Sequence, residues 1–209
     1  MNYNNILILA PHPDDAEFSS GGTLNKLIDE GSTVWYAVFS PCIKSLPAGT
    51  GEDRLYKELD KASSKLGIKQ DNIKKFDFPV REFPKYRQEI LEELVKLKKE
   101  INPDLVLIPN SNDVHQDHHA MYEEGIRAFK STRILGYELP WNNLASVHNF
   151  FVTLDRKNLD AKINAIGEYK SQDFRDYKEN DYFYCLAKTR GMQAQSEFAE
   201  AFELIRWIY

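Results

Sequence analysis

Residues 6–40 of this 209-residue chain are ILILAPHPDDAEFSSGGTLNKLIDEGSTVWYAVFS. The run at 6–10 is apolar throughout and ends at Pro11, which is typical of a buried strand. The segment 20–30 predicts a helix behind a serine cap, and the β-branched and aromatic residues at 33–40 predict a second strand. A strand, a helix and a strand in this order favour a parallel sheet with right-handed crossovers.

The same alternation continues along the rest of the chain. The pattern predicts further helices at 52–66, 85–101 and 159–170, further strands at 73–78, 104–109, 134–139 and 149–154, and a closing helix and strand after residue 182. No linker rich in Gly, Pro or Ser divides the chain, and its length suits one α/β domain or two small ones. We expect a single domain over residues 1–209, built on a doubly wound, mostly parallel sheet with helices on both faces.

Composition excludes several classes of protein. Lys plus Arg is 27 and Asp plus Glu is 32, a net charge of −5, so we expect no nucleic-acid partner. Cys42 and Cys185 form neither a zinc pair nor a disulfide framework and suit a reducing compartment. The start MNYNN lacks a basic segment, and no apolar run is long enough to span a bilayer, so we expect a cytoplasmic protein without a membrane partner. The terminal ELIRWIY (203–209) offers aromatic surface for a homo-oligomer contact.

Four of the five histidines lie in two short loops, PHPDD (11–15) and NSNDVHQDHH (110–119), each directly after a predicted strand. The carboxyl ends of parallel strands meet at one edge of a sheet, so we expect the two loops to converge. A lone Asp-Asp pair is usually a turn or a helix cap, and a lone H-x-D-H string is more often a solvated helix start. The two elements together, both behind apolar strands, favour a site.

The spacing within each loop is that of a metal chelate. His12 and Asp15 are three positions apart and so can fall on one side of a turn. With His118 they would form a His₂Asp set, which suits a catalytic zinc with an open position, and also ferrous iron. Asp14 lies between two of these residues and could act as a general base on a metal-bound water.

A zinc ion lowers the pKa of its bound water and polarises a carbonyl. His115, held as an imidazolium and oriented by Asp117, would stabilise the oxyanion and protonate a leaving amine. These residues predict a metal amidase. A metal-containing sugar-binding protein without turnover is an alternative, but a binder needs neither Asp14 nor His115. An amidase acting on a thiol conjugate or another non-sugar amide is a second alternative. No G-x-G-x-x-G follows the first strand, so a dinucleotide enzyme is excluded.

Three stretches carry a resemblance to a known family. APHPDDAEFSSGGTL (10–24) resembles the signature of the PIG-L, or LmbE-like, family of zinc-dependent N-acetylglucosaminyl deacetylases. DRLYKELDKASSKLG (53–67) and VHQDHHAMYEEGIRAF (114–129) are similar to its further elements, and the match covers most of residues 5–130. The resemblance implies a Rossmann-like fold and removal of the acetyl group from a small N-acetylated amino sugar, such as a nucleotide-linked sugar or a glycoside.

The resemblance also implies roles for individual residues. It implies one zinc ion per chain on His12, Asp15 and His118, with Asp14 as base, His115 as acid, Asp117 as its orienting partner and Arg54 as a substrate-binding residue. The stretch DFPVREFPKYRQEI (77–90) departs from the family, since Arg81 stands where many members carry an acidic residue. A guanidinium there favours a substrate with a phosphate or carboxylate, which it pairs with bidentately.

Overall fold

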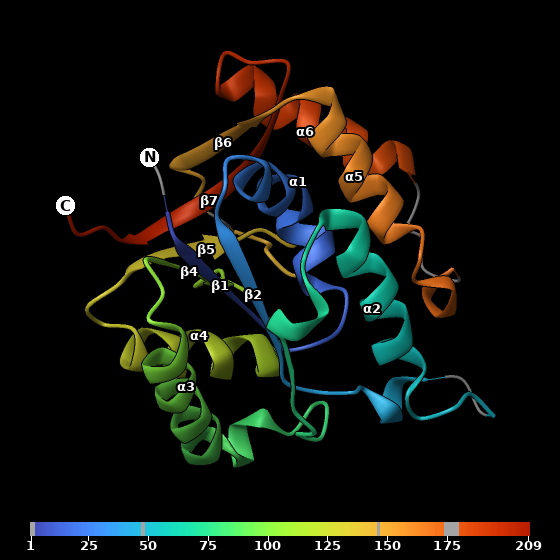
Figure 1. Ribbon diagram of the computed structural model, residues 1–209, viewed down its shortest axis with the longest axis vertical. Helices are drawn as coiled ribbons and strands as arrows, with labels where there is room; N and C mark the ends of the chain where they lie inside the picture. Colours follow the sequence, from blue (N-terminus) through green and yellow to red (C-terminus); the bar gives the residue numbers. More distant parts are fainter. Residues whose placement is uncertain (1–2, 47–48, 146, 174–179) are drawn as a thin grey trace.

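A mixed sheet forms the centre of the computed structural model, which describes residues 3–46, 49–145, 147–173 and 180–209 (Figure 1). Within these residues the strands are β1 (Asn5–Ala10), β2 (Thr33–Val38), β3 (Ile73–Lys75), β4 (Leu105–Pro109), β5 (Arg133–Tyr137), β6 (Phe150–Leu154) and β7 (Phe198–Arg206). Their order in the sheet is β3-β2-β1-β4-β5-β7-β6. The first five strands in that order pair in parallel, and β7 runs antiparallel to both β5 and β6. The predicted mostly parallel α/β sheet is confirmed.

Helices cover both faces of the sheet (Figure 1). One layer holds α1 (Asp15–Asp29), α2 (Arg54–Leu66), α5 (Arg156–Ile166) and α6 (Asn180–Gln193), and the other holds α3 (Arg87–Ile101) and α4 (Gln116–Ala128). Short 3-10 turns lie at Ile43–Ser45, Gln70–Asn72, Phe83–Lys85 and Lys170–Gln172. The arrangement is the doubly wound one that the sequence predicts.

The central strand β1 packs on both layers. Ile6, Ile8 and Ala10 belong to the core under α1, α2 and α5, whereas Leu7 and Leu9 belong to the core under α3 and α4. A strand with both faces buried needs apolar residues at every position, which explains the uninterrupted run at 6–10.

The strand order places a topological switch point at the carboxyl end of β1. From β1 the chain proceeds to β2 and β3 on one side, then crosses to β4 on the other side of β1. The loops that leave β1 and β4 lead to helices on opposite faces of the sheet and border a crevice between them. These loops are residues 11–14 and 110–115, and the helices that follow them begin at Asp15 and Gln116.

Helix α1 begins at Asp15, five residues before the predicted start at Ser20. Asp14 provides the N-cap position with a left-handed backbone (φ 102°), and Asp15 and Glu17 lie in the first turn. Negative side chains are favoured there because the helix dipole is positive at its N-terminus. Ser20 is fully buried inside the helix and caps nothing.

The carboxyl-terminal strands hold α1 in place. Glu200 of β7 accepts hydrogen bonds from the backbone N–H groups of Gly22 (3.1 Å) and Thr23 (2.7 Å). The same buried carboxylate pairs with Lys162 of α5 at 2.6 Å. A Cβ on Gly22 would lie 2.5 Å from Leu154 Cδ1, so a larger residue would force the Leu154 side chain to move where α1 approaches β6.

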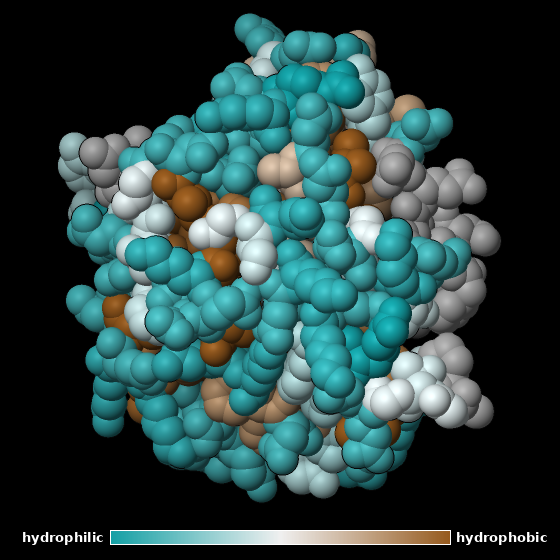
Figure 2. All heavy atoms as spheres, turned by 45° about the vertical axis from the view of Figure 1, so that its right-hand side comes forward, coloured by the Kyte–Doolittle hydropathy of each residue, from teal (hydrophilic) through white to brown (hydrophobic). Residues whose placement is uncertain are grey.

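The surface is largely polar. Figure 2 shows a mainly hydrophilic face on which the described hydrophobic atoms form separate small patches. In the terminal segment, Trp207 packs on Phe150 of the same chain with ring centroids 5.4 Å apart, while Ile208 and Tyr209 are exposed. The homo-oligomer stays a prediction.

None of the described helices combines the length and the apolar character that crossing a bilayer demands.

Candidate active site

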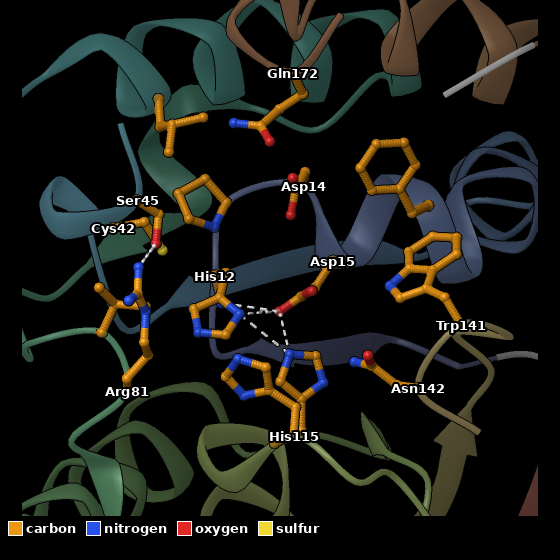
Figure 3. A pocket seen from close by; sticks show the side chains of 15 residues that line it. His12, Asp14, Asp15, Cys42, Ser45, Arg81, His115, Trp141, Asn142 and Gln172 are labelled. Carbon is orange, nitrogen blue, oxygen red and sulfur yellow. Dashed lines mark hydrogen bonds and ion pairs between the residues drawn. The ribbon is translucent and has the colours of Figure 1, made fainter. Parts of the chain in front are cut away.

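The two histidine loops converge, as predicted. Nδ1 of His12 lies 3.1 Å from Nε2 of His118, and Oδ2 of Asp15 lies 3.6 Å from the first atom and 3.4 Å from the second. These atoms come from the β1 loop, the first turn of α1 and the first turn of α4. Figure 3 shows the side chains of His12 and Asp15 pointing toward each other inside a pocket that His118 also lines.

Buried carboxylates behind the two imidazoles fix their tautomers. Nε2 of His12 lies 3.0 Å from Oδ2 of Asp117, and Nδ1 of His118 lies 2.9 Å from Oδ2 of Asp113. An ionised carboxylate only accepts hydrogen bonds, so Nε2 of His12 and Nδ1 of His118 carry the protons. When both rings are neutral, as metal ligation requires, the two opposite nitrogens direct their lone pairs into the 3.1 Å gap between them.

The electrostatics of this cluster favour a cation between the three donor atoms. Burial by itself lowers the pKa of His118, but the carboxylates of Asp15 and Asp113 outweigh it and raise the pKa to about 9. Burial by itself raises the pKa of Asp117, but hydrogen bonds from His12 and from two backbone N–H groups outweigh it and lower the pKa. In a tetrahedral zinc site, donor atoms lie about 3.4 Å apart, and the three separations here bracket that value. The donor set thus fits a metal ion.

His115 stands beside this set. One nitrogen from each of His12, His115 and His118 can be chosen so that all lie within 4.8 Å, so the three imidazoles could hold a metal ion. Nδ1 of His115 accepts the backbone N–H of Asp117 at 3.1 Å, as the N-cap of α4. Burial and the neighbouring His118 lower the pKa of His115 to about 4.

This geometry corrects the expected pairing of His115 with Asp117. The Asp117 carboxylate receives His12 and the backbone N–H groups of Arg81 (2.6 Å) and Phe83 (3.2 Å), and only its own backbone contacts His115. Residues that are two positions apart in the first turn of a helix direct their side chains differently. The Asp117 carboxylate therefore turns to His12 rather than to His115. His115 is therefore a neutral imidazole rather than an imidazolium held by a carboxylate, and its proton lies on Nε2.

A cavity of about 250 Å³ lies above the cluster (Figure 3). It is lined by His12, Pro13, Asp14, Asp15, Phe18, Cys42, Ser45, Leu55, Val80, Arg81, His115, His118, Trp141, Asn142 and Gln172. Asp14 belongs to this lining, and its left-handed backbone turns it away from the direction of its neighbour Asp15. The cavity joins the charged cluster to an aromatic wall of Phe18 and Trp141, whose rings meet edge to face at 5.7 Å.

Sequence reasoning did not assign several of these residues. Asp113, which positions His118, also accepts the backbone N–H of His115 (2.9 Å) and contacts Asn142 (3.4 Å). The sequence offered one signal for this positioning role, which is an aspartate two positions before His115. Trp141 and Gln172 come from segments remote from both motifs, and the periodicity of those segments marks only strands and helices.

The model of the PIG-L family, described as GlcNAc-PI de-N-acetylase, matches residues 7–129, which is more than half of the chain. The chain belongs to the PIG-L family. The matched segment runs from β1 through α4 and contains both histidine loops.

Other PIG-L-like sequences are similar over most of this chain. The diacetylchitobiose deacetylase of Thermococcus kodakarensis is 25% identical over 228 residues, covering 98% of this chain and 84% of that protein. A probable N-acetyl-α-D-glucosaminyl L-malate deacetylase 2 of Bacillus cereus is 24% identical and covers 80% and 83% of the two chains. These relatives carry names of deacetylases that act on N-acetylated sugars.

A solved structure shares the fold. The N,N′-diacetylchitobiose deacetylase of Pyrococcus horikoshii superposes with a TM-score of 0.81 at 21% identity, over 97% of this chain and 84% of that one. The LmbE-like, Rossmann-like architecture that the resemblance implied is thereby confirmed.

The two arginines that the sequence analysis assigned to substrate binding lie in different places. Arg81 lines the cavity, as expected for a substrate-binding residue. Arg54 is outside the lining, and its Nε pairs with Glu58 at 2.7 Å. Glu58 in turn accepts the backbone N–H (3.0 Å) and the hydroxyl (2.6 Å) of Ser171, next to Gln172 in the pocket wall. Arg54 thus contacts Glu58, which holds Ser171 beside Gln172, and it does not line the cavity.

Proposed function

We propose that this protein is a metal-dependent N-deacetylase that hydrolyses the acetamido group of a small N-acetylated sugar. One observation carries the proposal: three donor atoms suited to a metal ion lie at the floor of a cavity that Asp14 and His115 also line. Membership of the PIG-L family and the deacetylase relatives support the same reaction.

We assign the metal to His12, Asp15 and His118. The donor atoms of these three residues lie within 3.6 Å of one another. The nitrogens of the alternative set, His12, His115 and His118, lie within 4.8 Å of one another. Two nitrogens and one carboxylate oxygen suit zinc, and ferrous iron accepts the same set. Such an ion supplies Lewis acidity, lowering the pKa of a water molecule and polarising the amide carbonyl.

Asp14 is the general base in this proposal. Its carboxylate takes a proton from the attacking water, and the water oxygen forms the new bond to the carbonyl carbon. The neutral His115 donates its Nε2–H to the carbonyl oxygen as negative charge develops there. Asp14 then returns the proton to the amide nitrogen, the carbon–nitrogen bond breaks, and the second proton of the water passes from the acetic acid to the amine, so that acetate and an ammonium group result.

The cavity wall suits a sugar. Trp141 and Phe18 present apolar ring surface, which matches the apolar C–H face of a pyranose. Asn142 and Gln172 add side-chain amides that can both donate and accept hydrogen bonds from hydroxyl groups. The lining thus combines aromatic surface with a larger share of polar groups, which suits a ligand that carries many hydroxyl groups.

Acetate release from N-acetylated sugars tests the proposal, beginning with N,N′-diacetylchitobiose and N-acetylglucosamine glycosides. The zinc-loaded protein should release acetate, and removal of the metal with a chelator should abolish the activity. Asp14→Asn should retain one metal ion per chain while kcat falls about 100-fold or more. Asp53→Asn, which removes an exposed carboxylate paired with Lys57, is the matched control and should stay active.

Three outcomes would contradict the proposal in different ways. Full activity of Asp14→Asn would refute the assignment of the base. Tight sugar binding by the metal-loaded protein without acetate release would identify a binding protein. Acetate release from simple amides but from no sugar would leave an amidase of a different substrate class.

A further inference from the structure

Arg81 presents a guanidinium group at the mouth of the cavity. Its Nη2 donates hydrogen bonds to the backbone oxygen of Lys44 (3.2 Å) and to the hydroxyl of Ser45 (3.0 Å). Both partners are uncharged. Figure 3 shows Arg81 beside Ser45, on the side of His12 away from Trp141. The cavity therefore has a cationic end and an aromatic end, with the proposed reaction centre between them.

Nearby acidic groups are engaged elsewhere. Glu82, the next residue, forms ion pairs with Lys44 and with Lys85 (3.0 Å for the latter). Asp117 takes the backbone N–H of Arg81, not its side chain. Within the described part of the chain, no carboxylate lies within ion-pair distance of the Arg81 guanidinium. Its charge is left without an anionic partner.

Positive charge is concentrated around this position. We define the cationic rim as Lys44, Arg81, Glu82 and Lys85, which together carry three positive charges and one negative charge. The whole chain has a net charge of −5, so the rim is opposite in sign to the molecule that bears it. Such a local excess of positive charge at a pocket mouth attracts anionic ligands.

The backbone at Arg81 is held by the site itself. It has a left-handed conformation (φ 68°), which is unfavourable for a non-glycine residue and persists only where the surroundings enforce it. Its N–H donates to Asp117 Oδ2 at 2.6 Å, and the same oxygen lies 3.0 Å from His12 Nε2. The Arg81 backbone is thus tied to the proposed metal ligand, and the hydrogen bonds to Lys44 and Ser45 orient the guanidinium.

We propose that Arg81 recognises a carboxylate or phosphate on the substrate, at a position outside the acetamido group. The proposal rests on the proposed function and narrows it to anionic conjugates of N-acetylated sugars. With Nη2 bound to Lys44 and Ser45, the N–H groups on Nε and Nη1 remain for an anionic ligand, and each can donate a charge-assisted hydrogen bond.

A set of matched substrates tests this proposal. The three arms are a methyl glycoside of N-acetylglucosamine, a glycoside with a carboxylate on the aglycone, and N-acetylglucosamine 1-phosphate. For the wild type we expect kcat/KM at least tenfold higher for one or both anionic arms than for the neutral arm, mainly through KM. The better anionic arm distinguishes a carboxylate from a phosphate ligand.

Arg81→Gln should lose most of this preference, because kcat/KM should fall more on the anionic arms than on the neutral arm. Arg81→Lys should recover part of the preference, because it restores the charge but not the planar guanidinium. Lys96→Gln is the matched control: it removes one positive charge from an exposed lysine that pairs with Glu93 outside the cavity lining, and it should change the preference less than twofold. Metal content should be equal in all variants.

Equal turnover of neutral and anionic arms by the wild type would overturn the role of Arg81 and leave the proposed function intact. Equal losses on all arms in Arg81→Gln would also overturn it, since they would indicate support of Asp117 alone. Release of acetate from no arm would refute the proposed function instead. In that case calorimetric binding of the three sugars decides: the proposal requires tighter binding of an anionic sugar that Arg81→Gln abolishes.

Discussion

Nε2 of His12 lies 3.0 Å from Oδ2 of Asp117, although 105 positions of sequence separate the two residues. The carboxylate sets the imidazole tautomer and leaves Nδ1 facing the centre of the cluster. It also receives the backbone N–H groups of Arg81 and Phe83. One buried side chain thus aligns a proposed metal ligand and the loop at the mouth of the cavity.

Replacement of Asp117 by Asn should weaken metal binding about 10- to 100-fold, because the amide removes the negative charge that makes the His12 imidazole more basic. Competition with a chelator of known affinity measures the change. Asp53→Asn, an exposed carboxylate substitution, provides the comparison. An unchanged metal affinity in Asp117→Asn would exclude this carboxylate as a determinant of binding.

Two substitutions distinguish the two possible ligand sets. If His12, Asp15 and His118 hold the ion, Asp15→Ala should lose the metal and His115→Ala should keep one ion per chain while losing most activity. Elemental analysis of the purified variants decides between them. The reverse pattern, with metal lost from His115→Ala and kept by Asp15→Ala, would assign the three-histidine set instead.

Trp141 should contribute to substrate binding rather than to the chemical step. Trp141→Ala removes most of the aromatic wall, and we expect KM to rise about tenfold with little change in kcat. Trp141→Phe should recover part of the loss, because it restores a ring. Trp207→Phe, at a site where the ring packs on Phe150 away from the cavity, is the control. A fall in kcat alone for Trp141→Ala would contradict this role.

The ion cluster around Glu138 predicts a pH dependence of stability. Nε2 of His148 lies 3.1 Å from this nearly buried carboxylate, and Arg190 forms an ion pair with it. Burial by itself raises the pKa of Glu138, but these two partners outweigh it and hold the pKa below 4.5. A carboxyl group with a lowered pKa in the folded state stabilises the fold above its unfolded pKa, and this stabilisation disappears as the pH falls through the folded pKa.

Glu138→Gln should therefore reduce the free energy of unfolding by about 2 kcal/mol at pH 7, and the difference from wild type should shrink as the pH falls below 4.5. Urea unfolding at a series of pH values provides the measurement. Asp160→Asn, in an exposed pair with Arg156, should show little difference at any pH. A constant gap for Glu138→Gln down to pH 3 would contradict the linkage.

The periodicity of the sequence predicts nearly every strand and helix, because burial on both faces of β1 and on one face of each helix leaves a clear apolar pattern. The start of α1 was wrong by five residues. A serine was available as a cap, whereas the structure uses a left-handed Asp14, and a backbone conformation leaves no such signal. The insertion of β7 between β5 and β6 is a matter of tertiary pairing, which no local pattern encodes.

The convergence of His12, Asp15 and His118 follows from one rule, that ligands collect beyond the carboxyl ends of parallel strands. The partner of Asp117 could not be predicted in this way. Sequence proximity favoured His115, but the direction of a side chain at a helix start is decided by the packing of the Arg81 loop above it. Trp141 and Gln172 were missed because only the folded chain brings their segments to the cavity.

The cavity draws on two separate parts of the polypeptide. His12, Asp15, His115 and His118 lie within the family-matched segment 7–129, whereas Trp141, Asn142 and Gln172 lie beyond it. Glu200 fastens the second part to α1 through a buried carboxylate, independently of the residues that face the cavity. Substitutions at Trp141 or Gln172 can therefore reshape the wall without disturbing the hydrogen bonds of the histidine cluster. An engineer who wished to change the preferred sugar could randomise Trp141 and Gln172 and leave the histidine cluster untouched.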